Sequence, residues 1–291
     1  MNERSEIYSK IFSRMALNDK YAHVLETVFK STIEAIDFHN KKESVAKINS
    51  WVSDCTHNRI NDILTESQIH DNIAFVLINI IFFKSEWKNK FNSKDSYFGE
   101  FYQESGSEVK AEFMTQKCIV RLFDDEQNRF QALSLDFKSN DLVGLFVLPS
   151  EGKTVKDLIS ILTFTDLKKC IDLSYSSDVE VSVPKFKIKS KSSIKEILGQ
   201  MGVKEIFDGQ RCNLENISDH PLFVEDIIHS STVEIDEKGV VAAAATEVTF
   251  AFRCAIQTKE FILNRPFLFV IWDRQTNLPL FVNAIHDPTK H

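Results

Sequence analysis

The residues from Val233 to Thr246 read VEIDEKGVVAAAAT, and this stretch decides how the rest of the chain is interpreted. It joins a β-type segment to a charged turn, which contains one of the chain's 8 glycines, and then to a run of small side chains. Alanine favours a helix, but the run is short for an independent helix, and Val240, Val241 and Val248 prefer an extended backbone. We therefore expect a segment that can extend and enter a crowded sheet.

The patterns on either side predict more strand than helix. Apolar runs or alternation predict strands at 72–83, 117–123, 130–137, 142–148, 179–188, 223–235, 265–272 and 278–285. The first run is apolar throughout, which predicts a central strand buried on both faces. Helical spacing predicts helices at 20–30, 44–55, 154–162, 166–171 and 193–201, the third of them capped by Thr154. The expected fold class is α+β with large mixed or antiparallel sheets.

Composition and charge exclude several classes of protein. The 291 residues are 43% hydrophobic and show no repeat or linker, so we expect a single globular domain over 1–291. A net charge of −7 argues against a nucleic-acid partner. The apolar run at 73–83 is too short to cross a bilayer, so no membrane association is expected. The first residues, MNERSEIYSK, place charges where an export signal would be apolar.

The chain contains no recognisable catalytic machinery. The motifs GxSxG, GxxxxGK[ST], GxGxxG and HExxH are all absent from the sequence. The 5 cysteines form no CxxC pair, and the acidic turn at 124–126 is typical of a solvated strand connection. We therefore expect no enzyme, no metal and no cofactor.

Several stretches together resemble the serpin family and occur in that family's order. Besides 234–246 they are NIIFFKSEW at 79–87, VPKFKI at 183–188, LGQMGVKEIF at 198–207, NRPFLFVI at 264–271 and PLFVNAIHDPT at 279–289. The chain is most similar to the intracellular poxvirus serpins, including the cowpox cytokine response modifier, through its AAAAT hinge and the cysteine at 254. Family members begin with helices and a strand ahead of the segment similar to 7–14, so the resemblance implies an N-terminally shortened serpin fold.

The resemblance also implies a mechanism and its residues. A protease cleaves an exposed reactive-centre loop, expected at about 237–259, and the loop's hinge then inserts into the main sheet and drags the acyl-enzyme along. The hinge positions are Glu237, Gly239, Val240, Ala242, Ala243, Ala244, Ala245 and Thr246, where Val240 replaces the family's usual Thr or Ser. Trp87 matches a tryptophan at the top of the sheet where the loop enters, and Asn79 and His229 match residues at the opening point of the sheet.

Alternate side chains of an inserted strand point inward. If Val240 is the first, the inward set is Val240, Ala242, Ala244, Thr246, Val248 and Phe250. None of these side chains is charged, so their burial does not incur the free-energy cost of removing a charge from water.

Counting from Glu237 with the family's loop length places the scissile bond between Arg253 and Cys254. Arg253 predicts a trypsin-like target. A bond shifted by one or two residues would present Phe252 and favour a chymotrypsin-like target, whereas a caspase is disfavoured because no Asp lies nearby.

These expectations combine into two functional hypotheses. The first is a monomeric suicide-substrate inhibitor of a host serine protease, with a cysteine protease as the alternative target. It would act in the cytoplasm of an infected host cell and modulate proteolysis, inflammation or apoptosis, and it would be extracellular only if exported by another route. The second is a non-inhibitory serpin-like binding protein, whose shortened scaffold cannot insert its loop.

Overall fold

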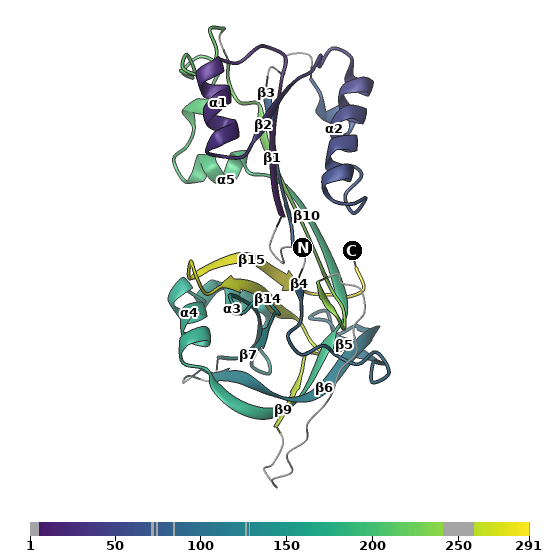
Figure 1. Cartoon of the computed structure of the whole chain (residues 1–291). Coiled ribbons are helices and arrows are strands. Elements are labelled where there is room, and N and C mark those ends of the chain that lie inside the picture. The colour runs from purple at the N-terminus through teal and green to yellow at the C-terminus, as the bar shows by residue number, and fades with distance from the viewer. Residues whose placement is uncertain are drawn as a thin grey trace. The chain divides into compact units, whose positions relative to one another are not determined.

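The computed structural model describes residues 6–70, 73, 75–83, 85–125, 127, 129–220, 222–240 and 259–290. The chain forms two compact units. The five-stranded unit comprises Ser5–Phe83 and Ile188–Val233, and the eight-stranded unit comprises Met1–Arg4, Lys84–Lys187 and Glu234–His291. Each unit is named here after its main sheet (Figure 1).

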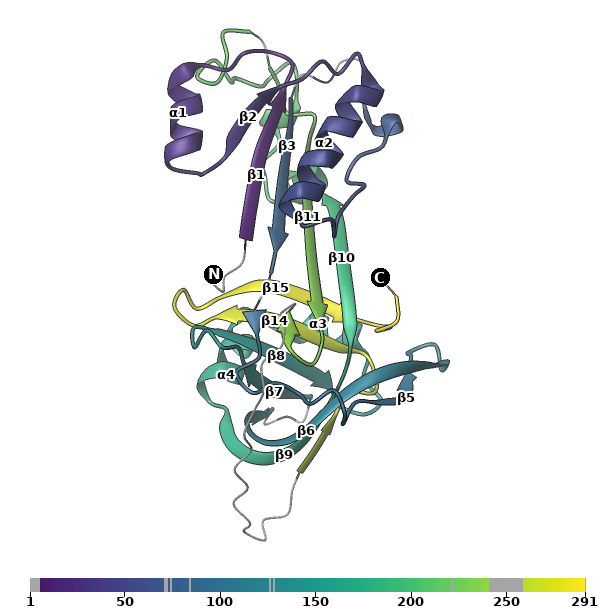
Figure 2. The ribbon, with the colours of Figure 1, turned by 45° about the vertical axis from the view of Figure 1, so that its right-hand side comes forward.

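The sheet of the five-stranded unit has the strand order β10-β11-β3-β1-β2. Its strands are β1 (Glu6–Ser13), β2 (Thr32–Ala35), β3 (Phe75–Phe82), β10 (Phe186–Ser193) and β11 (Asp226–Ile235). The helices of this unit are α1 (Asp19–Thr27), α2 (Lys41–Cys55) and α5 (Lys195–Gln200), with short 3-10 turns at η1 (Glu66–Gln68) and η2 (Glu205–Phe207). Strand β3 runs antiparallel to β1 and parallel to β11 (Figure 2).

Helices α1 and α2 cover opposite faces of this sheet (Figure 1). Ile48 and Val52 of α2 pack against Ile78 and Ile80 of β3, whereas Leu25 of α1 lies in the cluster on the other face. Alternate β3 residues divide between the two faces because a strand places successive side chains on opposite sides.

The sheet of the eight-stranded unit has the order β13-β9-β6-β7-β8-β14-β15, with β5 paired to β6 beside this path. Its strands are β5 (Tyr97–Tyr102), β6 (Glu108–Asp124), β7 (Phe130–Asp136), β8 (Leu142–Pro149), β9 (Tyr175–Pro184), β13 (Lys259–Ile262), β14 (Phe267–Asp273) and β15 (Leu278–Ile285). A separate two-stranded sheet pairs β4 (Ser85–Glu86) with β12 (Gly239–Val240).

Helices α3 (Val155–Ile161) and α4 (Phe164–Asp172) each pack one apolar side against strands β7, β8 and β14. Both helices begin with a capping box, in which Thr154 pairs with Asp157 and Thr163 with Asp166. The side chain of the capping threonine satisfies a backbone N–H that the first turn of a helix leaves unpaired. The predicted cap at Thr154 is confirmed.

The predicted fold class is confirmed, with differences in several elements. Strand β3 is central, but only one of its faces is fully buried, because Leu77, Asn79 and Ile81 on the other face are half-buried. The helix expected at 193–201 is shorter, since β10 continues to Ser193 and α5 begins at Lys195. Strands β1, β2, β4, β5, β12 and β13 were not predicted. No helix in the described part of the chain is long and apolar enough to cross a membrane.

The acidic turn at 124–126 has a structural role in the described residues. Asp125 accepts hydrogen bonds from the guanidinium of Arg129, with Nε at 2.8 Å and Nη2 at 2.8 Å. This pairing, followed by burial of the carboxyl as an opposing effect, holds the pKa of Asp125 below its usual range. The described ranges contain no cluster of three residues that could hold a metal ion.

Candidate functional site

The first part of the predicted hinge is a tight turn that begins at Asp236, directly after β11. The backbones of Asp236 and Gly239 close the turn through two hydrogen bonds of 3.1 and 3.2 Å. The Asp236 carboxylate accepts from the N–H groups of Lys238, at 2.8 Å, and of Gly239, at 3.2 Å. An aspartate that bonds to backbone groups two and three residues ahead is a common way of fixing a turn. The carboxyl is partly buried, and this burial raises the pKa of Asp236 above its ordinary value.

Gly239 occupies a position that only glycine fits. Its φ is +121°, and an added Cβ would lie 2.5 Å from the carbonyl oxygen of Ser85 and 2.5 Å from the backbone nitrogen of Trp87. Real Cβ atoms do not approach backbone atoms this closely. The glycine therefore lets β12 lie directly against β4, with Gly239 opposite Glu86 and Val240 opposite Ser85.

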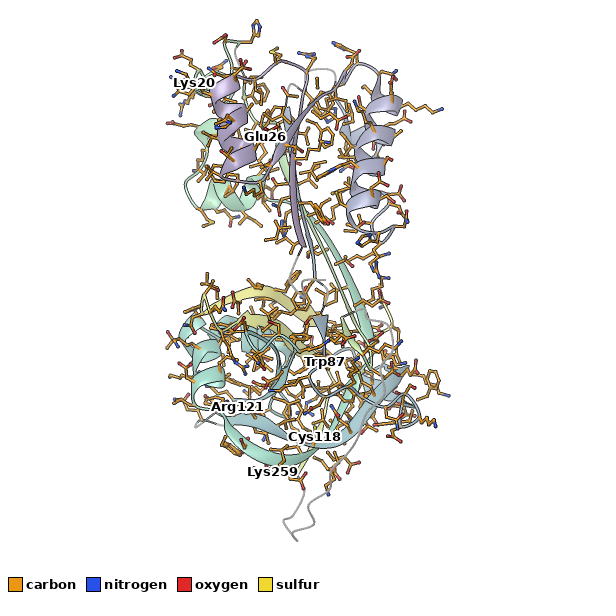
Figure 3. The ribbon with its side chains drawn as sticks, in the orientation of Figure 1. Lys20, Glu26, Trp87, Cys118, Arg121 and Lys259 are labelled. Carbon is orange, nitrogen blue, oxygen red and sulfur yellow. The ribbon has the colours of Figure 1, made fainter. Side chains whose placement is uncertain are left out.

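Trp87 holds the turn from the β4 side. Its indole Nε1–H donates to the carbonyl of Asp236 at 3.0 Å, and its backbone N–H donates to the carbonyl of Lys238 at 2.9 Å. The ring is 1% exposed and stacks on Phe137 with centroids 4.5 Å apart and an angle of 6° between the planes (Figure 3). A buried ring with a satisfied N–H is a rigid anchor. Trp87 thus packs in the core and binds the hinge through the same side chain.

The Glu237 carboxylate is held by two side chains, one directly before β5 and one directly after β9. Its carboxylate accepts from the Nζ of Lys185 at 2.6 Å and from the hydroxyl of Ser96 at 2.8 Å. The Glu237 carbonyl also accepts from the N–H of Phe91 at 2.9 Å. Burial by itself raises the pKa of this carboxyl, but the hydrogen bonds from Lys185 and Ser96 outweigh burial and hold the pKa of Glu237 below its usual range. The side chain is therefore charged and immobilised at neutral pH.

Asn79 and His229 face each other across the parallel pair of β3 and β11 in the five-stranded unit. The Nδ1 atom of His229 lies 3.2 Å from the Oδ1 atom of Asn79, so the neutral ring with a proton on Nδ1 donates to the amide oxygen. Burial lowers the pKa of His229. Among the described residues, this side-chain hydrogen bond connects the neighbouring strands β3 and β11.

The segment that follows the hinge ends at β13, which is anchored by a small polar cluster. The Nζ of Lys259 donates to the Tyr175 hydroxyl at 2.8 Å, and this hydroxyl donates to the carboxylate of Asp124. The Lys259 ammonium also lies 5.1 Å from the centroid of the Tyr175 ring. The hydrogen bond to Tyr175 raises the pKa of Lys259. The described residues on either side of 241–258 therefore have defined contacts within the eight-stranded unit.

The structure brings some of the predicted site residues together. Trp87, Glu237 and Gly239 form one cluster in the eight-stranded unit, and Asn79 and His229 form one pair in the five-stranded unit. Val240 contributes its backbone to β12. The remaining predicted positions lie outside the described residues: Ala242, Ala243, Ala244, Ala245, Thr246, Arg253 and Cys254.

Three contributors to the hinge cluster were missed at the level of sequence: Asp236, Ser96 and Lys185. Asp236 could have been found, because an aspartate before Lys and Gly is a typical turn signal. Lys185 and Ser96 carry no local signal, since each reaches Glu237 only through the folding of distant strands.

Comparison with known proteins agrees with this geometry. The family model for Serpin (serine protease inhibitor) matches residues 2–288. Serpin I2 of Homo sapiens is 29% identical over 277 residues, which cover 94% of this chain and 68% of that protein. Iripin-3 of Ixodes ricinus is 33% identical over 275 residues, which cover 94% of this chain and 70% of that protein.

A solved structure of thyroxine-binding globulin in complex with thyroxine is also similar, with a TM-score of 0.88 and 25% identity. The match covers 100% of this chain and 78% of that chain. The family match spans almost every described element of both units. The chain belongs to the serpin family of serine protease inhibitors and has the serpin fold.

Proposed function

We propose that this protein is a suicide-substrate inhibitor of serine proteases whose bait loop lies between β12 and β13. The observation that carries the proposal is the rigid start of that loop. Trp87, Glu237 and Gly239 fix the chain up to residue 239 through hydrogen bonds and close backbone packing. Because the start of the loop is fixed, the residues that follow it can move in a defined way once the loop is cleaved.

The order of strands in the five-stranded sheet supports an insertion mechanism. Strands β3 and β11 are parallel neighbours, paired from Val76 to Phe82 with Asp226 to Thr232. A segment that follows β11 through a tight turn must run antiparallel to β11, and hence antiparallel to β3 as well. Its insertion would replace one parallel ladder with two antiparallel ladders, which are slightly more stable per residue. The sheet would therefore gain backbone hydrogen bonds when the cleaved loop inserts between β3 and β11.

The composition of the hinge supports the same mechanism. Every second residue from Val240 to Phe250 is small or uncharged, so the side chains that would face the interior carry no charge. An unpaired charge at one of these positions would cost several kcal/mol. The sequence is thus compatible with burial of the whole hinge.

Arg253 is proposed as the anchor for the target protease. A basic residue before the scissile bond fits the acidic specificity pocket of trypsin-like enzymes. Cleavage one residue earlier would present Phe252 and select a chymotrypsin-like enzyme instead. The resemblance of the hinge to poxvirus serpins leads us to propose that the target is a host protease and that the monomeric inhibitor acts in the cytoplasm of the infected cell.

The test is incubation of the purified protein with trypsin at a near-equimolar ratio. We expect a complex that survives a denaturing gel, together with a released C-terminal peptide that begins at Cys254 by mass spectrometry. An Arg253→Gln variant should keep its fold and lose the complex. Simple cleavage at Arg253 with full trypsin activity remaining would contradict inhibition of trypsin-like enzymes.

A second candidate is a non-inhibitory serpin that binds a small molecule or protein. It is favoured by the similarity to thyroxine-binding globulin, whose solved structure contains thyroxine. The same experiment separates the two candidates when it is repeated with a chymotrypsin-like enzyme. If neither enzyme forms a complex and neither loses activity, the second candidate is preferred.

A further inference from the structure

Strand β5 (Tyr97–Tyr102) has one paired side and one open side. It pairs with β6 alone, and in the described part of the chain no backbone group outside these two strands bonds to Phe98 or Glu100. Figure 1 and Figure 2 both show β5 at the outer margin of the eight-stranded unit. An edge strand with unpaired backbone groups is a template for pairing with another chain.

A hydrogen bond on the far side of β6 shows which residues of β5 face the open side. The N–H of Lys185, directly after β9, donates to the carbonyl of Glu112 at 2.7 Å. Glu112 therefore directs its backbone groups away from Phe98, its neighbour in β5. Because antiparallel strands alternate between bonded and non-bonded pairs, Phe98 and Glu100 direct their N–H and C=O groups to the open side.

The side chains on this strand are aromatic and exposed. Phe98 is 66% exposed, and Tyr97 and Tyr102 are exposed as well. The Nζ of Lys110 on β6 lies 5.5 Å from the centroid of the Phe98 ring, and the same lysine is directly opposite Glu100. Aromatic side chains of this kind are enriched where proteins contact one another.

Gly99 lies midway between the two residues that offer free backbone groups. A two-fold axis through Gly99 would place Phe98 of each copy opposite Glu100 of the other, and every one of these groups would then be paired. The two Gly99 residues would form the non-bonded pair on the axis, where Cα atoms approach to about 4.5 Å. A glycine suits so close an approach. Packing within the monomer also requires it, because the Tyr97 ring lies 3.1 Å from the position of an added Cβ.

A simpler explanation is that β5 is a solvated edge protected by Glu100, because charged side chains discourage edge pairing. In the two-fold register this protection fails, since Glu100 would meet the Phe98 ring and the Lys110 ammonium of the other copy rather than a second carboxylate. Glu112, which lies beside Phe98, is neutralised by Lys185 at 2.7 Å. Opposite charges at neighbouring cross-strand positions are favourable. Charge complementarity therefore favours a second copy as the occupant of this edge.

We propose that β5 is a pairing edge through which two copies of this chain form an antiparallel dimer about Gly99. The pairing is reversible, because a strand of 6 residues offers a short interface. The inhibitor proposed above is the dilute monomer, and the dimer forms as the concentration rises. No residue of 237–259 takes part, so this inference does not rest on the proposed function.

Sedimentation velocity of the full chain from about 1 to 200 µM measures the association. We expect a reversible monomer–dimer equilibrium with a Kd of about 10 to 100 µM. Glu100→Lys and Lys110→Glu each bring like charges together twice across the axis, and each should weaken the dimer at least about tenfold. An equimolar mixture of these two variants should recover the dimer, because opposite charges then face each other.

Glu26→Lys is the charge-matched control, because this exposed side chain lies on α1 in the five-stranded unit (Figure 3). It should dimerise as the unchanged protein does, and circular dichroism checks that all variants are folded. A chain that stays monomeric over the whole concentration range would overturn the proposal. A mixture that associates no better than each variant alone would also overturn it, as would equal weakening by Glu26→Lys and Glu100→Lys.

Discussion

Gly239 is the residue with the least freedom in the hinge cluster. Replacement by alanine would place a Cβ 2.5 Å from backbone atoms of Ser85 and Trp87, at a φ that L-residues avoid. We expect Gly239→Ala to lower the free energy of unfolding by at least about 2 kcal/mol. Gly152 is the matched control, because it also has a positive φ, of +74°, but nothing lies within 4 Å of its Cβ position. Urea denaturation in which both variants lose the same stability would show that the close packing at Gly239 is unimportant.

Glu237 predicts a dependence of stability on pH. Its folded pKa lies below the unfolded value, so its contribution is complete above the unfolded pKa and is lost as the pH falls through the folded pKa. We expect Glu237→Gln to cost about 1 to 2 kcal/mol near neutral pH, and progressively less as the pH falls below the unfolded pKa of a glutamate. Chemical denaturation at several pH values measures this difference. The exposed Glu180, replaced by Gln, provides the control and should show no such trend.

Residues of the site differ in how far sequence could predict them. Trp87 and Gly239 were identified from a resemblance, and in the structure each contacts the chain segment of the other. Lys185 was not identified, although it lies in the quoted VPKFKI stretch. Its role depends on the three-dimensional meeting of that stretch with Glu237, and a charged residue on a strand has no pattern that names its partner.

At the scale of elements, an inserted hinge should place alternate side chains on opposite faces of the sheet, and this alternation can be tested. If the segment inserts as a strand, Ala244 faces the interior and Ala243 faces outward. We expect Ala244→Arg to turn the inhibitor into a substrate, with the fraction of trypsin trapped falling by more than tenfold, because an unpaired buried charge costs several kcal/mol. Ala243→Arg adds the same side chain on the other face and should still trap trypsin. Denaturing gels of both variants measure the trapped fraction, and equal trapping would argue against an alternating inserted strand.

Strand prediction succeeded where burial is complete and failed where it is partial. Strand β8, whose eight residues are all buried, was predicted almost to its ends. Strand β1 was missed because Lys10 and several serines interrupt its apolar residues, and only Ile11 and Phe12 at one end are buried side chains of the core. Strand β3 was located correctly, but the half-burial of Leu77 and Asn79 depends on what covers that face of the sheet, which the strand's own residues do not specify.

For the whole molecule, the parallel ladder between β3 and β11 is the pairing that an inserted loop would replace. The pairing joins Asp226–Thr232 to Val76–Phe82, and the side chains of His229 and Asn79 bridge it at 3.2 Å. An inserted strand breaks this ladder and the bridge, but forms two new ladders in their place. The net gain is therefore set by the new backbone hydrogen bonds minus those that are lost.

This balance predicts that the protein becomes more stable when its loop is cut. With about 1 kcal/mol for each net hydrogen bond and a shift of 2 to 4 °C per kcal/mol, limited proteolysis at Arg253 should raise the Tm by at least about 10 °C. Differential scanning calorimetry of intact and cleaved protein measures the shift. Cleaved Ala244→Arg is the control, because it is cut at the same bond but cannot bury its hinge, and its Tm should stay near that of the intact protein. If the cleaved unchanged protein melts at or below the intact one, the fold does not insert its loop, and the binding-protein alternative takes precedence.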